Sequence, residues 1–315
     1  MNVLSLFDGM SCGQLALQKA GIKYDKYYAS EIDEHAIAIT KKNFPKTIQV
    51  GNVIDLKSDN LPKIDLLIGG SPCQGFSMAG KQLNFDDKRS KLFFEFVRLL
   101  NDIKPKYFLL ENVKMKKEYR DIISSYLGVD CIEINSNLVS AQNRKRLYWT
   151  NINNIKQPID KKIFLKNILQ KNIVDKKYFL KESSIIKQNI QKYRDEKLAK
   201  QAVFTERRTE EAKRIRREYS KKHGRDFSPR RAKEMVPRTD NKCNCLTTSL
   251  TKEHVLIDKK YNFRKLTPIE CERLQTVPDN YTNHTNISDT QRYKMLGNGW
   301  TISVIAHIFK NLKNT

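Results

Sequence analysis

The sequence predicts an α/β protein built on a doubly wound, mostly parallel sheet with helices on both faces, joined to a smaller second domain. In the first half of the chain, short apolar runs alternate with stretches of helical periodicity, which is typical of parallel sheets. Glycine and proline end several of these runs, as turns after strands require. The expected strands are 2–6, 26–31, 47–50, 64–69, 106–111, 131–135 and 146–150, and the helices between them include 13–20, 34–43 and 90–102.

The second half of the chain has a different character. Segment 186–236 is polar and has no apolar run, and residues 206–238 contain 13 Lys or Arg against 6 Asp or Glu. Acidic and basic residues recur there at helical spacing, which indicates a charged helix that either binds a polyanion or is merely solvated. Apolar periodicity returns after residue 262 and ends in an amphipathic helix near 301–312. We therefore expect one domain formed by 1–155 with 285–315 and a second formed by 156–284.

The composition favours a basic protein that binds a polyanion inside the cell. The formal net charge is +24 and the isoelectric point is near 9.7, and strongly basic proteins most often bind nucleic acid or another polyanion. Hydrophobic residues make up 39% of the 315, which supports a substantial core. The chain has no run of about 18 apolar residues and opens at Val3 without a basic leader. We therefore expect a cytoplasmic, nucleoid-associated protein without a membrane span.

The six cysteines favour free thiols. They lie at positions 12, 73, 131, 243, 245 and 271, scattered through a chain too large to need disulfides, which is typical of a reducing compartment. Cys243 and Cys245 form a short pair, but no second pair follows at zinc-like spacing. The cysteines therefore predict no metal site.

The stretch Gly69-Gly70-Ser71-Pro72-Cys73-Gln74-Gly75-Phe76-Ser77 is the most informative part of the chain. It follows the apolar run 64–68, so Cys73 would lie at the carboxyl end of a strand, where open α/β sheets place their ligands. An ionised cysteine is the most nucleophilic common side chain. Taken alone, a small buried core cysteine is the commoner explanation, and the other motifs have to decide between the two.

A second candidate site begins at the first strand. Residues Leu4–Gly13 lead from a strand through a glycine-containing turn into a helix, which presents backbone N–H groups to an anionic ligand, although not in a GxGxxG pattern. Glu31 ends the second strand 24 residues after Phe7, where an acid accepts hydrogen bonds from ribose hydroxyls in doubly wound folds. Asn52 follows the third strand, where an adenine edge would lie. Together these residues predict a nucleotide-like cofactor.

Seven motifs follow one another along the chain in a recognisable order. They are Phe7-Asp8-Gly9, Glu31, Gly51-Asn52, Pro72-Cys73-Gln74, Glu111-Asn112-Val113, Gln142-x-Arg144-x-Arg146 and Gly297-Asn298. In this order they resemble the DNA (cytosine-5) methyltransferase family, over residues 1–150 and about 262–310. Further likeness to the vertebrate de novo DNA methyltransferases lies in Leu4–Gly13, Arg89-x-x-Leu92-Phe93-Phe94-Glu95-Phe96 and Gly299-Trp300. The compact chain is similar to bacterial and phage members.

The resemblance implies a Rossmann-like S-adenosylmethionine-dependent methyltransferase domain that methylates C5 of a cytosine flipped out of duplex DNA. Cys73 would add to C6 of the ring, and Glu111 would contact N3 and the exocyclic amine. Arg144 and Arg146 would share one face of a strand because of their i, i+2 spacing. Arg144 would face the flipped base, while Arg146 would lie closer to the framework or a phosphate. Two alternatives stay open: a tRNA cytosine-5 methyltransferase on the same scaffold and a non-catalytic DNA-binding relic.

The resemblance also implies the cofactor, S-adenosylmethionine, with no metal. Its site would consist of Phe7, Asp8, Gly9, Met10, Glu31, Ile32, Asn52, Val53, Pro72, Leu92, Asn298 and Trp300. Phe7 and Trp300 would offer aromatic surface to the adenine or the sulfonium. Two positions depart from the family pattern, since Ser11 stands where a glycine is usual and Asn52 where an aspartate is usual. Because asparagine lacks the charge, cofactor affinity is the property that this change would alter.

Segment 156–284 falls where the family has its target-recognition region. Cys245–Ser249 resembles the small-residue strand of that region, and Arg264–Gln275 resembles the motif that frames it. The expected DNA contacts are Gln74, Ser77, Arg207, Arg208, Arg216, Arg217, Arg230 and Arg231, where the arginines suit phosphates. We expect a monomer that binds double-stranded DNA. Restriction–modification with a cognate endonuclease, phage self-protection and solitary regulation all fit the chain.

Overall fold

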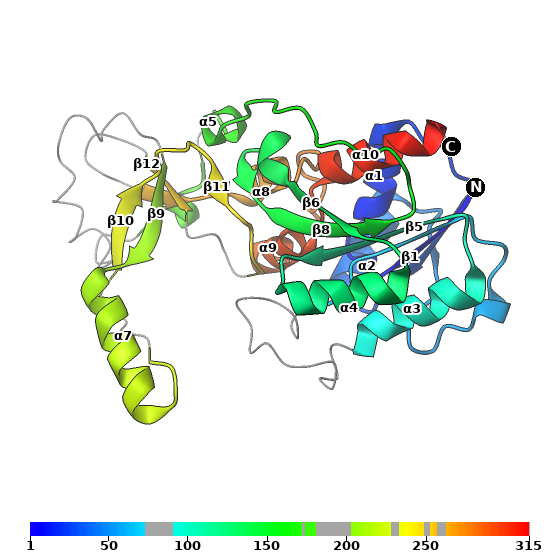
Figure 1. The fold of residues 1–315 in the computed structure, drawn as a ribbon. Helices are drawn as coiled ribbons and strands as arrows, with labels where there is room; N and C mark the ends of the chain where they lie inside the picture. The colour runs from blue at the N-terminus through cyan, green and yellow to red at the C-terminus, as the bar shows by residue number, and fades with distance from the viewer. Residues whose placement is uncertain are drawn as a thin grey trace.

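A seven-stranded sheet forms the centre of the structure, a computed structural model that describes residues 1–72, 91–171, 174–180, 203–227, 233–248, 253–256 and 263–314 (Figure 1). Its strands are β1 (Asn2–Leu6), β2 (Lys26–Ser30), β3 (Ile48–Gln49), β4 (Leu66–Gly69), β5 (Tyr107–Val113), β6 (Cys131–Asn135) and β8 (Lys145–Thr150). Their order across the sheet is β3-β2-β1-β4-β5-β8-β6. The seven strands expected from the apolar runs are confirmed, with ends that differ by at most two residues.

The sheet is parallel from β3 to β5 and becomes antiparallel at β8. β1 pairs with β2 and β4, β2 with β3, and β4 with β5, all in parallel. β8 runs antiparallel to both β5 and β6 and places Arg146 opposite Val113. β1 and β4 are buried along nearly their whole length, as strands covered on both faces must be. The carboxyl ends of β1, β2, β4 and β5 therefore meet at one edge of the sheet.

Helices cover both faces of this sheet (Figure 1). α1 (Cys12–Ala20) and α10 (Ile302–Phe309) lie on one face, and α3 (Lys91–Ile103) and α4 (Lys117–Leu127) lie on the other. The described residues also form α2 (Glu34–Asn43), α5 (Leu165–Ile168), α8 (Pro268–Leu274) and α9 (Asp289–Asn298). Helices α1, α2, α3 and α10 confirm the helices expected there. Two apolar clusters lie on the two faces: Leu15 and Ile305 belong to the first, and Phe93 and Ile123 to the second. Among the described residues, no helix combines the length and hydropathy needed to cross a bilayer.

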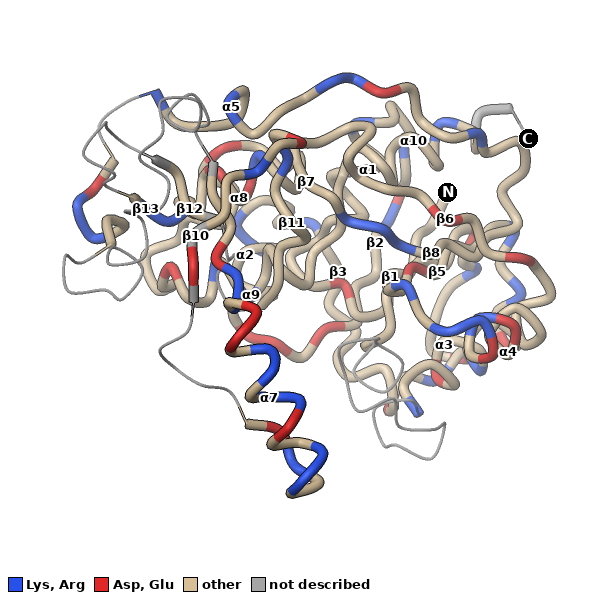
Figure 2. The backbone as a smooth tube through the Cα atoms, turned by 60° about the vertical axis from the view of Figure 1, so that its left-hand side comes forward, with Lys and Arg blue, Asp and Glu red and all other residues tan. Residues whose placement is uncertain are grey.

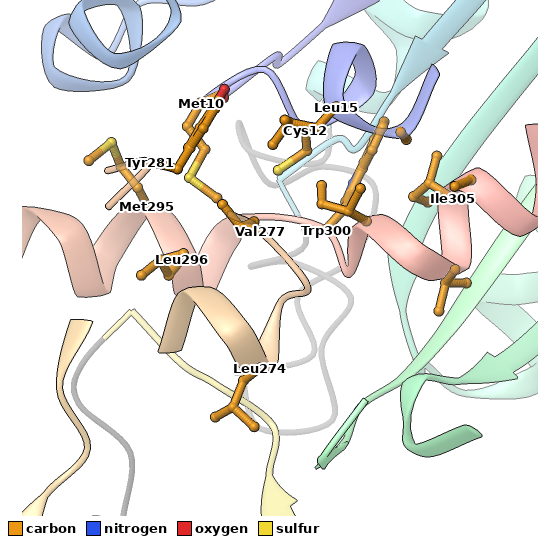
Figure 3. Close-up of a cluster of buried hydrophobic side chains, with 14 of the residues drawn as sticks. Met10, Cys12, Leu15, Leu274, Val277, Tyr281, Met295, Leu296, Trp300 and Ile305 are labelled. Carbon is orange, nitrogen blue, oxygen red and sulfur yellow. The ribbon is translucent and has the colours of Figure 1, made fainter. Parts of the chain in front are cut away.

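Residues near the end of the expected recognition region pack into the first apolar cluster. Leu274, Val277 and Trp300 all belong to this cluster, and Val277 and Trp300 lie near Met10 and Cys12 at the β1–α1 turn (Figure 3). α8 begins at a capping box, in which Thr267 Oγ1 accepts from the Glu270 N–H at 3.2 Å and the Glu270 carboxylate accepts from the Thr267 N–H at 2.9 Å. This cap fixes where α8 starts, and α8 in turn supports the connection between α9 and α10.

A second sheet lies apart from the first (Figure 1). It consists of β9 (Val203–Arg208), β10 (Lys233–Pro237), β12 (Glu253–Leu256) and β13 (Phe263–Lys265), all antiparallel, in the order β10-β9-β12-β13. Its buried rings are Phe204 and Phe263, whose centroids are 5.0 Å apart. The helix α7 (Glu210–His223) projects from it, as the charge pattern predicted. The sequence did not predict β9 and β10, and the division into two domains at residues 155 and 284 stays a prediction.

A short parallel pair joins the two halves of the chain. β7 (Gln142–Asn143) pairs with β11 (Cys243–Asn244), so that Gln142 lies opposite Cys243 and Asn143 opposite Asn244. The residues that follow these strands, Arg144 and Cys245, are brought together as a result. This contact links the central sheet to the segment that the sequence placed in the recognition region.

Candidate active site

A cavity of about 910 Å³ opens at the carboxyl edge of the central sheet. Its wall contains all twelve residues that were expected to bind a cofactor: Phe7, Asp8, Gly9, Met10, Glu31, Ile32, Asn52, Val53, Pro72, Leu92, Asn298 and Trp300. Glu111, Arg144 and Arg146 line the same cavity. The wall also includes Asp33 and Lys294, an ion pair at 2.7 Å that the sequence did not suggest. The fold thus brings residues from both ends of the chain into one site.

The turn between β1 and α1 forms one wall of this cavity through three residues with positive φ. Phe7, Gly9 and Ser11 have φ angles of 57°, 59° and 61°. A residue other than glycine is strained there by about 1–2 kcal/mol, which explains why a glycine would suit the position of Ser11. The Ser11 hydroxyl accepts a hydrogen bond from Gln14 Nε2 at 2.8 Å, and this contact offsets part of the strain.

Glu31 is held at the end of β2 by three backbone N–H groups. Its Oε2 accepts from Gly9 at 2.7 Å, and its Oε1 accepts from Ile32 and Asp33 at 2.8 and 2.9 Å. These bonds tie β2 to the β1–α1 turn and orient the carboxylate in the cavity wall. Asn52 Oδ1 accepts from the backbone N–H two residues ahead at 3.3 Å. Among the described residues this is the hydrogen bond that its side chain makes, which leaves a second lone pair and the amide protons for a ligand.

Asp8 is a buried acid in the same wall with one unpartnered oxygen. The Tyr27 hydroxyl donates to Asp8 Oδ1 at 2.8 Å, whereas Oδ2 is buried and has no hydrogen-bond partner among the described residues. Burial raises the pKa of Asp8 from 3.8 to about 6, hydrogen bonds from neighbouring hydroxyls oppose the rise, and the charge of Glu31 adds to it. Buried polar atoms are nearly always satisfied, so within the described part of the chain this oxygen is an acceptor that still lacks a donor.

Asp8→Asn is expected to flatten the pH dependence of stability. Because the folded-state pKa of Asp8 lies above the unfolded one, its carboxylate disfavours the fold at neutral pH, and stability increases as the pH falls through about 6 toward 3.8. Between about pH 7 and pH 5, protonation of Asp8 should add about 1 kcal/mol to the free energy of unfolding. Denaturant unfolding of both proteins at these two pH values measures this gain. Equal gains in wild type and variant would show that Asp8 titrates normally.

Glu111 and Arg146 form an ion pair in the same cavity. Arg146 Nε donates to Glu111 Oε1 at 2.9 Å, and the two side chains are only 13% and 11% exposed. The chain beyond β4 passes close by, since a Cβ on Gly70 would lie 3.2 Å from Glu111 Oε2 and 3.0 Å from Trp300 Nε1. The segment that leads toward Cys73 therefore starts directly beside this carboxylate.

Arg144 is buried, and its guanidinium group is surrounded by acceptors. Nη1 donates to the Leu246 carbonyl at 3.1 Å and to Cys245 Sγ at 3.2 Å. Nη2 donates to the carbonyls of Gly297 and Gly299 at 3.1 and 2.9 Å. Arg144 thus joins the α9–α10 connection to the chain after β11.

Cys245 is a site residue that the sequence did not single out. Its Sγ accepts from Arg144 and also from Arg146 Nη2, at 3.5 Å, so both arginines point to the same side, as their spacing predicted. The partners are about a hundred positions away in the sequence. In the sequence, the one local indication was that the segment beginning at Cys245 resembles the small-residue strand of the recognition region. That resemblance does not predict a contact between Cys245 and the two arginines.

The residues expected to contact DNA lie away from this cavity or outside the described residues. Arg207 and Arg208 lie on β9, and Arg216 and Arg217 lie on α7, which projects from the molecule (Figure 2). Arg216 forms an ion pair with Asp226, and Arg217 Nε donates to a carbonyl of its own helix at 3.3 Å. Cys73, Gln74, Ser77, Arg230 and Arg231 lie outside the described residues.

Comparison with known sequences shows similarity along the whole chain. The model of a family described as C-5 cytosine-specific DNA methylase matches residues 1–314. The chain is 30% identical to the Type II methyltransferase M1.ScrFI of Lactococcus lactis subsp. cremoris, over 98% of this chain and 77% of that protein. It is 28% identical to the orphan methyltransferase M.SPRI of Bacillus phage SPR, over 100% of this chain and 98% of that one.

Comparison with solved structures shows the same fold. The methyltransferase EhMeth of Entamoeba histolytica superposes with a TM-score of 0.69 at 20% identity, over 100% of this chain and 98% of that one. The S. pombe Dnmt2 methyltransferase superposes with a TM-score of 0.65 at 17% identity, over 100% and 99%. The expected α/β methyltransferase fold with its mostly parallel sheet is therefore confirmed.

Proposed function

This chain belongs to the family of C-5 cytosine-specific DNA methylases, and we propose that it methylates a cytosine flipped out of duplex DNA through a covalent bond between Cys73 and C6. Its activity as a DNA cytosine-5 methyltransferase follows from the family and from the full-length likeness to type II enzymes. The observation that best supports the mechanism is the Glu111–Arg146 pair, which lies in the same cavity as all twelve expected cofactor residues.

S-adenosylmethionine, when bound, supplies a methyl group attached to a sulfonium. The cavity fits a ligand of this size, since small-molecule pockets usually enclose about 300–1,000 Å³. We assign Phe7 and Trp300 to the adenine or the sulfonium, Glu31 to the ribose and Asn52 to the adenine edge. The unpartnered Oδ2 of Asp8 adds a buried acceptor that suits a cationic ligand.

The residues of the chain divide the reaction into addition and elimination. The Cys73 thiolate forms a bond to C6, and the electron pair of the C5–C6 double bond moves onto C5 and toward N3. Glu111 shares a proton with N3 and so stabilises the charge that builds up on the ring. C5 then takes the methyl group; the S–CH3 bond of the sulfonium would break in this transfer and leave S-adenosylhomocysteine as the second product. Loss of the C5 proton to a base and departure of Cys73 restore the double bond and the free thiolate.

We assign the contact with the base to Arg146 rather than to Arg144. Arg146 is the arginine paired with Glu111, and its planar fork suits the carbonyl O2 of cytosine. Arg144 is only 2% exposed, less than the 13% of the Arg146 side chain, and its guanidinium group binds the backbone carbonyls of the α9–α10 connection and of the chain after β11. This exchanges the roles that the sequence suggested for the two arginines.

Base-resolution methylation sequencing of DNA from a methylation-free host that expresses the protein tests the proposal. Methylcytosine at one short motif would establish duplex DNA as the substrate and identify the recognition sequence. Unmethylated DNA in cells that contain the folded protein would contradict the proposal, and tRNA would then be tried as the methyl acceptor. The likeness to type II and orphan enzymes supports a role in restriction–modification or in solitary methylation.

The charged arm, defined as α7 with residues 224–227, supports DNA binding beyond the cavity. Figure 2 shows it projecting from the second sheet, with basic residues along its length. Lys213 and Arg214 form ion pairs with acidic residues of the same helix. Lys221 and Lys222, near its far end, have no such partner among the described residues. We propose that these two lysines contact phosphates of DNA that flanks the target cytosine.

Joint replacement of Lys221 and Lys222 by glutamine is expected to weaken DNA binding and to lower its salt slope by about 2, because each phosphate contact contributes about 0.9. The matched control replaces Lys213 and Arg214, which removes the same charge from ion-paired positions and should change the slope by less than about 1. Fluorescence anisotropy with a long duplex over a series of salt concentrations measures both slopes. An unchanged slope in the Lys221 and Lys222 variant would make the arm a solvated helix.

A further inference from the structure

Two guanidinium groups converge on one sulfur atom beside the proposed base pocket. Cys245 Sγ lies 3.2 Å from Arg144 Nη1 and 3.5 Å from Arg146 Nη2. Two positive charges this close repel each other unless an acceptor or an anion lies between them. Among the hydrogen bonds of the described residues, Cys245 is the acceptor that the two arginines share.

Two arginines shift this sulfur toward its thiolate form, while the carbonyl of Leu246, which accepts from Sγ at 3.3 Å, favours the thiol. Burial opposes ionisation of the Cys245 thiol, but the positive charges and hydrogen bonds of Arg144 and Arg146 outweigh burial and lower its pKa. Arg146 in turn pairs with Glu111 through its Nε. An arginine–thiolate contact is charge-assisted and stronger than a contact between neutral groups.

Backbone pairing places Cys245 at this point. β7 and β11 pair in parallel, and Arg144 and Cys245 are the residues directly after them. The chain after β11 is the segment that resembles the small-residue strand of the recognition region. Cys245 thus connects that segment to the ion pair in the cavity.

Each nitrogen of the Arg146 guanidinium has a different partner. Nε donates to Glu111 Oε1, Nη1 to the carbonyl of Lys145 at 2.9 Å, and Nη2 to Cys245. Of these three bonds, the one to sulfur is the bond that joins Arg146 to the segment after β11, which resembles part of the recognition region. Without it, the Nη2 edge of the guanidinium loses its partner, and rotation about the remaining bonds would carry the group away from Glu111.

We propose that Cys245 is a positioning residue for methyl transfer: its sulfur is the shared acceptor that holds the Arg146 guanidinium against Glu111 and ties this pair to the recognition segment. The inference rests on the proposed function of Glu111 and Arg146. It assigns Cys245 no contact with the base or the cofactor, because the sulfur acts through the two arginines.

Comparison of Cys245→Val with Cys245→Ser tests this role. Valine has a similar size but no acceptor, so kcat is expected to fall about 10- to 100-fold, the effect of losing a hydrogen bond to a charged group. Serine keeps an acceptor and should retain activity to within about fivefold. The KM for S-adenosylmethionine should stay unchanged in both variants, because Cys245 does not line the cavity. Cys131→Val, which alters a partly buried thiol on β6, is the control and should keep full activity.

The outcomes separate this inference from the proposed function. Trapping of wild-type protein on duplex DNA that carries 5-fluorocytosine tests the proposed function, and its failure there would remove both. If wild type is trapped normally and Cys245→Val is trapped at the same rate, the proposed function stands and the inference is overturned. Equal losses in the valine and serine variants would also overturn it, because the shared acceptor would then not be what matters.

An absorbance titration keeps the inference testable if the valine variant does not fold. Thiolate absorbs in the ultraviolet, so the difference between wild type and Cys245→Ser reports this thiol alone. Its midpoint is expected to lie below about 8.5, the value of an ordinary cysteine. A midpoint at or above that value would mean that the two guanidinium groups do not lie against the sulfur and would overturn the arrangement.

Discussion

Cys73→Ala is expected to abolish methyl transfer, with a loss of at least about 10⁴-fold in kcat, because removal of a nucleophile leaves only the binding contribution to catalysis. Binding of duplex DNA should change by less than about threefold, since a small neutral side chain replaces another. Single-turnover transfer of a radiolabelled methyl group measures the first quantity, and fluorescence anisotropy measures the second. Cys131→Ala is the matched control, because that thiol lies on β6 and not at the carboxyl edge of β4.

A mechanism-based trap makes this result decisive. Fluorine at C5 of the target cytosine cannot leave as a proton does, so the protein stays bound to C6 after methylation. Wild type should form a complex that survives denaturation, and Cys73→Ala should form none. A stable complex with the alanine variant would mean that another side chain attacks the ring and that the assignment of Cys73 is wrong.

The strands of the central sheet were predictable because they are buried on both faces. Their apolar runs are continuous, as in Leu66–Gly69, and need no knowledge of a partner to be recognised. β9 was not predictable, because it lies among charged residues and its buried Phe204 acquires its partner, Phe263, only through the fold. The charge pattern of α7 was visible in the sequence, but the strands on either side of it were not.

The cavity wall was predictable to a greater extent than the contacts within it. The twelve residues expected to bind a cofactor share one wall. Most of them follow β1, β2, β3 or β4 at the same edge of the sheet, whereas Leu92 lies in α3 and Asn298 and Trp300 lie at the end of α9, so that only the resemblance to the family could place these three. The i, i+2 spacing placed Arg144 and Arg146 together but could not say which would meet Glu111. That choice depends on the antiparallel register between β5 and β8. Cys245 could not be found at all, because only the pairing of β7 with β11 brings it to the arginines.

Glu111→Gln is the second change with a large expected effect, a fall in kcat of about 10²- to 10⁴-fold. Glutamine has the shape of glutamate and can still accept a hydrogen bond from Arg146, but it cannot share a proton with N3 of the ring. The negative charge that addition of Cys73 produces on the ring would therefore not be stabilised by a shared proton at N3. The KM for S-adenosylmethionine should change little. Rapid-quench methyl transfer at saturating DNA and cofactor measures the chemical step.

One control and one further variant test whether Glu111 acts through a proton that it shares with the ring or through its contact with Arg146. Glu133→Gln removes a carboxylate of β6 that forms an exposed ion pair with Lys114 at 3.1 Å, and it should leave kcat within about twofold, as surface pairs contribute little. Glu111→Asp keeps a carboxyl group that can hold a proton but shortens the side chain. If the proton matters, aspartate should retain more activity than glutamine. Near-full activity in the glutamine variant together with a large loss in the aspartate variant would mean that Glu111 acts by placing Arg146, since glutamine keeps that contact, and that the stabilising charge on the ring comes from the arginine alone.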